Sequence, residues 1–175
     1  MNPWLKRLFL ITSIGGGFAG AAVTGSQFAD SGQGPLNYAL IGVVTLAYSV
    51  GIIGGIELIE DEGKGLRVLS WYYLAQVPYL ISPVISYQFF SGLTLFGAVG
   101  SRGLTWGAYL GSRWLYGLFQ MHDPRFEVGA NAFGIWATWY LRWELGKKLA
   151  SQSPDPEPAP AAPDAGQPPR QFLTG

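Results

Sequence analysis

The chain has 175 residues, and its 11 acidic and 11 basic side chains balance, which argues against a nucleic-acid-binding protein with a basic surface. Charged residues make up only 13% of the chain, about half the share typical of soluble domains, and aromatic residues reach 15%. Cysteine is absent, which excludes disulfides, thiol catalysis and cysteine-ligated zinc. This composition predicts an integral membrane protein, in which Trp and Tyr gather at the two interfaces.

Three uncharged stretches are long enough to cross a bilayer as helices, which takes about 20 mostly apolar residues. They are the segments 8–28, 36–56 and 68–90. The first also resembles a cleaved signal peptide, because Lys6 and Arg7 precede it and small residues follow its apolar middle. A shorter fourth segment, 126–145, ends among aromatic and basic residues, as a helix does at a membrane interface.

The stretch 91–119 decides the number of spans, because it can be read in two ways. As a helix it would place Gly103, Gly107 and Gly111 in one close-packing stripe and form a fifth span. That helix would hold Arg102 near the bilayer centre, at a cost of about 2.5 kcal/mol or more. It would also carry the basic residues after position 141 to the outer side, against the rule that Lys and Arg stay inside.

As strands, the same residues form a hairpin over about 92–119 that turns at Ser101 and Arg102. Gly97 then lies opposite Trp106, and one face of the hairpin is apolar throughout. The other members of this face are Leu93, Leu95, Val99, Leu104, Ala108 and Leu110. Because lipid does not tolerate an open sheet edge, we expect the hairpin outside the hydrocarbon.

We therefore predict a mainly α, integral membrane fold: a four-helix transmembrane bundle with an extracytoplasmic β-hairpin between the third and fourth spans. Five transmembrane helices are the alternative. Residues 1–150 form the membrane domain, and residues 151–175, rich in Pro and Ala, form a disordered tail. Four spans keep most Lys and Arg on one side, so both termini are expected in the cytoplasm, at the inner (plasma) membrane of a bacterium.

Five residues are candidates for a polar path. Pro78 and Pro83 each remove a helical hydrogen bond from the third predicted span, and Gln76 and Ser86 recur beside them at helical spacing. Freed carbonyls in broken helices line substrate paths in transporters, but the same pattern also occurs in a purely structural kink. Glu57 lies inside the apolar pattern of the second span, where a carboxylate is a functional candidate.

Two pairs of glycines with four-residue spacing predict close helix packing. They are Gly16 with Gly20, and Gly51 with Gly55. Small residues at this spacing let two helix backbones approach one another in lipid. Such packing can occur within one bundle, so the pattern leaves the oligomeric state open.

His122, Asp123 and Glu127 are residue types that bind metals, but their spacing matches no ligand pattern, so no metal or cofactor is predicted. The expected function is that of a non-enzymatic structural or accessory component of the membrane. The first alternative is a small transporter or channel subunit that uses the kinked third helix, and the second is a membrane enzyme with a site near His122. The expected partners are the lipid bilayer and another membrane protein or a second copy of the chain, with no nucleic acid.

Overall fold

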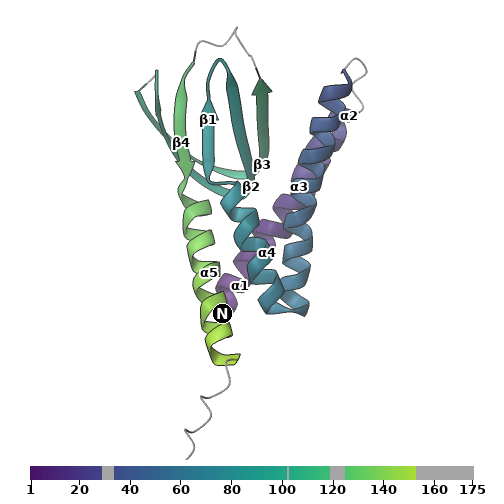
Figure 1. Ribbon diagram of the computed structural model, residues 1–175, viewed down its shortest axis with the longest axis vertical. Coiled ribbons are helices and arrows are strands. Elements are labelled where there is room, and N and C mark those ends of the chain that lie inside the picture. The colour runs from purple at the N-terminus through teal and green to yellow at the C-terminus, as the bar shows by residue number, and fades with distance from the viewer. Residues whose placement is uncertain (29–33, 102, 119–124, 153–175) are drawn as a thin grey trace, which may run out of the picture.

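The computed structural model describes residues 1–28, 34–101, 103–118 and 125–152, and this part of the chain contains four helices and one antiparallel sheet (Figure 1). The first helix has three consecutive segments, of which the middle one is a π-helical turn. The helical segments are α1 (Pro3–Leu10), the π turn (Ile11–Gly15), α2 (Gly16–Phe28), α3 (Pro35–Glu60), α4 (Glu62–Ala75) and α5 (Ala132–Gln152). The strands are β1 (Pro78–Ile81), β2 (Ile85–Gly100), β3 (Gly103–Leu118) and β4 (Glu127–Asn131).

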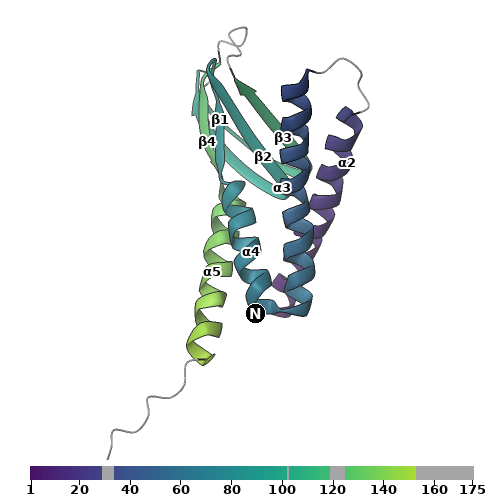
Figure 2. The same cartoon turned by 45° about the vertical axis from the view of Figure 1, so that its right-hand side comes forward.

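The first two predicted spans are helices. The continuous helix Pro3–Gln27 and the helix Pro35–Glu60 are long and apolar enough, by length and composition, to cross a membrane. They pack side by side along their length, with Gly20 against the ring of Tyr48. Figure 2 shows that both helices run beside the sheet in their upper half and beside α4 in their lower half.

The sheet curls because its short strands join the two halves of one long strand. β1 pairs with the first part of β2 on one side and with β4 on the other. β4 also pairs with the last part of β2, from Phe96 to Gly100, so β1, β4 and β2 form a closed ring of pairings. β3 follows β2 over its whole length as the fourth strand.

A bend in the β2–β3 ribbon makes this curl possible. Gly92 pairs with Gly111, and both have positive φ angles, +76° and +135°. Residues other than glycine rarely adopt this backbone conformation. The start of α2 lies in the bend, where the Ser112 hydroxyl donates a hydrogen bond to the carbonyl of Gly16. The first helix and the bent ribbon therefore hold each other in place.

The main apolar core lies below the sheet, where α1, α3, α4 and α5 meet. Phe9, Tyr73 and Leu141 are fully buried there, and the rings of Phe9 and Tyr73 pack edge to face at 5.6 Å. Burying a side chain of this size stabilises a fold by roughly 1.5–3 kcal/mol. The Tyr73 hydroxyl is also within 2.6 Å of the Thr12 hydroxyl, which ties α4 to the π turn.

The prediction of a third span over 68–90 is wrong. α4 ends at Ala75, and Pro78 opens β1 rather than kinking a helix. Proline is acceptable at the first residue of a strand, and the residues that follow are mostly aromatic and β-branched, which favours strands. Counting uncharged residues cannot distinguish a spanning helix from a helix followed by two apolar strands.

The predicted span over 126–145 is also wrong at its start, because Glu127–Asn131 forms β4 and the helix covers Ala132–Gln152. The four-helix transmembrane bundle is therefore overturned, since only two helices of the described residues have the length and composition to cross a membrane. The five-helix alternative fails too, because residues 103–118 form a strand. The hairpin and its register, with Gly97 opposite Trp106, are confirmed, and its strands extend to Ile85 and Leu118.

Candidate functional site

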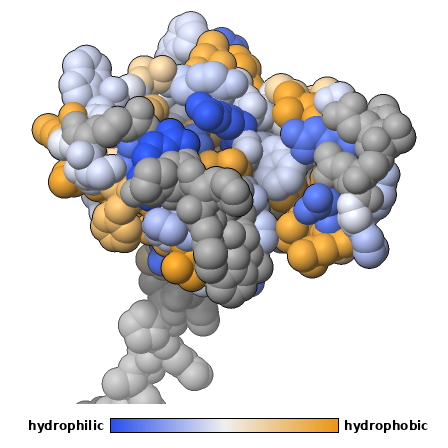
Figure 3. All heavy atoms as spheres, turned by 90° about the horizontal axis from the view of Figure 1, so that it is seen from above, coloured by the Kyte–Doolittle hydropathy of each residue, from blue (hydrophilic) through white to orange (hydrophobic). Residues whose placement is uncertain are grey.

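The curled sheet encloses a cavity of about 530 Å³, which is within the usual range of small-ligand sites. β1, β2 and β3 contribute lining residues, and Arg125, which precedes β4, completes the lining. The lining residues are Tyr79, Ile81, Gln88, Phe90, Phe96, Gly107, Ala108, Tyr109, Arg113, Leu115 and Arg125. Seen from the sheet end of the molecule, one group of hydrophilic residues lies near the middle and another on the right, with apolar residues between and around them (Figure 3).

Three stacked aromatic rings form one wall of this cavity. The ring of Tyr79 lies 6.3 Å from that of Phe90 and 5.7 Å from that of Phe96, and the Phe90 and Phe96 centroids are 5.9 Å apart. The planes of each pair are within 29° of parallel. This geometry fixes three rings from two strands as one apolar surface.

Charged groups lie beside the rings. The Tyr79 hydroxyl donates a 2.8 Å hydrogen bond to Oε2 of Glu127, whose side chain is buried on β4. Burial and this bond raise the pKa of Tyr79 to about 12, while the positive charges of Arg113 and Arg125 act in the opposite direction. Both guanidinium groups are therefore close enough to act on the hydroxyl. The site combines an apolar wall with two cations and one buried carboxylate.

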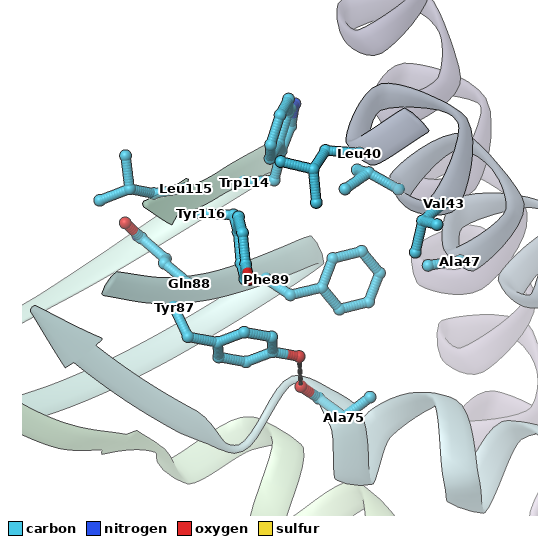
Figure 4. Close-up of a pocket in the computed structure, with 11 residues that line it drawn as sticks. Leu40, Val43, Ala47, Ala75, Tyr87, Gln88, Phe89, Trp114, Leu115 and Tyr116 are labelled. Atoms are coloured by element: carbon cyan, nitrogen blue, oxygen red, sulfur yellow. Dashed lines mark hydrogen bonds between the residues drawn. The ribbon is translucent and has the colours of Figure 1, made fainter. Parts of the chain in front are cut away.

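A second, apolar crevice of about 300 Å³ lies between α3 and the outer side of the β2–β3 ribbon. Figure 4 shows the rings of Phe89 and Tyr116 on the sheet side and the side chains of Leu40 and Val43 on the helix side. The Tyr87 hydroxyl closes one end by donating a 2.7 Å hydrogen bond to the carbonyl of Ala75. This crevice has the lining of a hydrocarbon site rather than of a catalytic one.

The sheet beyond the bend has its apolar side chains on the outside. Trp106 is 83% exposed and Leu110 is 78% exposed, and four further apolar residues of this face are between 44% and 75% exposed. Those four are Leu95, Val99, Leu104 and Val128. We call these six residues the outer apolar face. The mixed side of the hairpin, which includes Thr94 and Phe96, points inward instead.

The residues predicted to line a polar path do not lie along one helix. Gln76 is fully buried after the end of α4, where its Oε1 accepts a hydrogen bond from the backbone N–H of Ser91. Pro83 lies in the turn between β1 and β2, and Ser86 is a buried residue of β2 that donates a hydrogen bond to the carbonyl of Ser82. Pro78 is exposed at the start of β1. The kinked helix on which the path depended is absent.

The other predicted residues lie in different parts of the molecule. Glu57 is partly buried in the last turn of α3. Gly16 lies against Gly92, and Gly51 lies against the ring of Tyr72, while Gly55 contacts Ile14. These contacts join α3 to α4 and to the first helix, and join α2 to the sheet.

Among residues 1–28, 34–101, 103–118 and 125–152, no group of three His, Asp or Glu side chains is placed to hold a metal ion. His122 and Asp123 lie outside these residues, as do Arg102 and the predicted tail after residue 152. Of the three residues of that hypothetical metal site, only Glu127 is described, and its carboxylate accepts a hydrogen bond from the Tyr79 hydroxyl.

Sequence reasoning missed the cavity of the curled sheet. One signal for it was present, because the inward face of the hairpin contains Thr94, Phe96 and Tyr109, which is too mixed for a lipid-facing surface. Other lining residues come from β1 and the start of β2, which were assigned to a helix, and from Arg125 before β4. No protein-family model, no curated protein and no solved structure matches the chain.

Proposed function

We propose that the chain is a non-enzymatic membrane protein, a structural or accessory component that the helices Pro3–Gln27 and Pro35–Glu60 anchor in the bilayer. The observation that carries this proposal is the exposure of these helices. In their most apolar 18-residue windows only 39% and 28% of the residues are buried. The core helix of a soluble protein would bury most of such a window, because exposed apolar surface is unfavourable in water.

The exposed residues of α3 form one stripe, as lipid contact requires. Val43, Leu46, Val50 and Ile53 follow one another at three- and four-residue spacing and are each between 39% and 69% exposed. A stripe of this kind is the arrangement expected of a helix with hydrocarbon on one side.

The distribution of charge supports an orientation. α3 ends and α4 begins at the same end of the molecule as the last turns of α5, where Lys64 and Lys148 line one surface hollow. Arg113 and Arg125 belong to the opposite, sheet-bearing end. Because Lys and Arg accumulate on the cytoplasmic side, we propose that the end with the N-terminus and the end of α5 is cytoplasmic, in a bacterial inner membrane.

The chemistry of the sheet cavity supports binding rather than acid–base catalysis. Arginine stays protonated at all ordinary pH values. The Tyr79 hydroxyl, with its pKa near 12, also stays protonated at neutral pH. Groups that do not change protonation near pH 7 hold a ligand better than they transfer protons to it.

Spin labels test the lipid contact directly, because the chain has no native Cys. Single Cys substitutions at Val43 and Leu46, labelled after reconstitution, should give nitroxides that collide with dissolved oxygen more than with a water-soluble nickel complex. Ser151, exposed at the end of α5, is the matched aqueous control. Preferential collision with the nickel complex at Val43 and Leu46 would refute membrane anchoring.

A reporter fused after residue 150 tests the orientation separately. We expect a cytoplasmic signal. A signal from the opposite side would show that the charge argument for orientation is wrong, whatever the spin labels report.

A further inference from the structure

We propose that the cavity of the curled sheet binds an anionic amphiphile, a ligand with a carboxylate or phosphate group on an apolar body. The inference does not depend on the proposed membrane anchoring, because every residue that lines the cavity belongs to the sheet or its flanking residue Arg125. It assigns a ligand class to a space that β1, β2, β3 and Arg125 line.

The apolar part of the ligand is indicated by the aromatic wall. The rings of Tyr79, Phe90 and Phe96 stack on one another, and Ile81 and Leu115 extend the apolar lining. A wall of fixed rings recognises an aliphatic or aromatic body with little loss of conformational entropy, because the rings are already ordered.

The anionic part is indicated by the balance of charge. Arg113 and Arg125 are lining residues of the cavity, whereas Glu127 is outside the lining and accepts the hydrogen bond of the Tyr79 hydroxyl. Among the described residues at the cavity, these two cations and one carboxylate leave an excess of one positive charge. A guanidinium group matches a carboxylate or phosphate with two parallel hydrogen bonds, which fixes both the position and the orientation of the anion.

The position of Arg113 indicates where the two parts of the ligand would lie. It lies on β3 directly opposite Phe90, two residues from Leu115, and its side chain is exposed. Tyr79 and Phe90 of the aromatic wall are buried and Phe96 is partly buried, whereas the side chain of Arg113 is exposed. An anion held by Arg113 would therefore stay near water while its apolar body enters between the strands.

Binding can be measured with the full chain in a neutral maltoside detergent. The probe is a dansyl-labelled undecanoate, and its uncharged methyl ester is the matched control probe. We expect the carboxylate to bind at least tenfold more tightly than the ester, because one charge-assisted pair contributes at least this factor. Equal binding of the two probes would overturn the proposal, because binding would then depend on apolar contacts alone.

Two substitutions locate the binding. Arg113→Gln and Arg125→Gln should each weaken binding of the probe about tenfold. Arg142→Gln removes the same charge from α5, where the guanidinium packs on the ring of Trp71 at 5.1 Å, and should leave binding unchanged. If Arg142→Gln weakens binding as much as Arg113→Gln does, the site is elsewhere and the proposal fails.

Competitors distinguish the sources of the anion. Displacement of the probe by octanoate but not by acetate supports a free amphiphile, and displacement by phosphatidylglycerol in mixed micelles supports a lipid headgroup with its chain. Displacement by inorganic phosphate as effective as that by octanoate would overturn the proposal, because the aromatic wall would then take no part. These comparisons use the unaltered protein, so they hold even where a variant fails to fold.

Discussion

The contact between α2 and the bend of the sheet predicts a large effect of a single methyl group at Gly16. A Cβ atom there would overlap the backbone nitrogen of Gly92 and lie 2.9 Å from its Cα, whereas carbon atoms pack at about 3.5–4.0 Å. Both Gly92 atoms belong to the backbone at the bend and cannot rotate away, and the Ser91 hydroxyl oxygen obstructs the same position from 2.5 Å. In Gly16→Ala the helix must therefore retreat from the ribbon.

Gly25→Ala is the matched control, because this residue is in the same helix and nothing lies within 4 Å of its would-be Cβ. Both substitutions gain the same helix propensity. Overpacking costs about 1–3 kcal/mol and the weakened hydrogen bond from Ser112 to Gly16 about 1 kcal/mol, so Gly16→Ala should be about 2–4 kcal/mol less stable than Gly25→Ala.

Equilibrium unfolding in detergent micelles, followed by circular dichroism, measures this difference. The reasoning is refuted if the two variants unfold at the same denaturant concentration. Such a result would mean that α2 does not press against the bend, and that the curl of the sheet depends on the glycine pair alone.

Four further outcomes are expected. Tyr79→Phe removes a donor from the buried carboxylate of Glu127 and should lower the free energy of unfolding by about 1–3 kcal/mol in thermal or denaturant melts. The backbone N–H groups at the start of α4 hold the pKa of Asp61 below its usual 3.8, so its stabilising effect is present above that pH and is lost as the pH falls through the lowered pKa. Asp61→Asn should remove this acid-dependent part of the unfolding curve, and an unchanged curve would contradict the capping role. Trp106→Ala should change stability in detergent by less than about 0.5 kcal/mol, because the side chain is exposed, and a larger loss in the same melts would mean that the indole covers the sheet. Glu57→Gln should be nearly silent in folding assays, since the carboxylate is only partly buried in the last turn of α3, and a large loss of stability would point to a buried partner.

The sequence was sufficient for features that depend on neighbouring residues. The helix Pro35–Glu60 could be predicted because its apolar stretch is long and uncharged. The register of the hairpin could be predicted because Ser101 stands in a glycine-flanked turn between two strands with period-two patterning. In both cases the deciding interactions are local.

The rest depends on contacts between distant residues, which no local pattern shows. Pro78 was interpreted as a kink because the residues around it are uncharged, although a strand tolerates proline at its first position equally well. The cavity requires β4 to lie between β1 and β2, and the bond between Tyr79 and Glu127 joins residues 48 positions apart. A pattern within one segment cannot predict such a pairing.

The pairing of β4 has a consequence for the order of folding. β4 contacts both β1 and the far part of β2, and α5 begins at the very next residue, Ala132. The position of α5 is therefore tied to two strand pairings at once, one with β1 and one with the last part of β2. Pairings between residues far apart in the chain form slowly, so we expect the sheet to close late in folding and the start of α5 to become fixed in the same step.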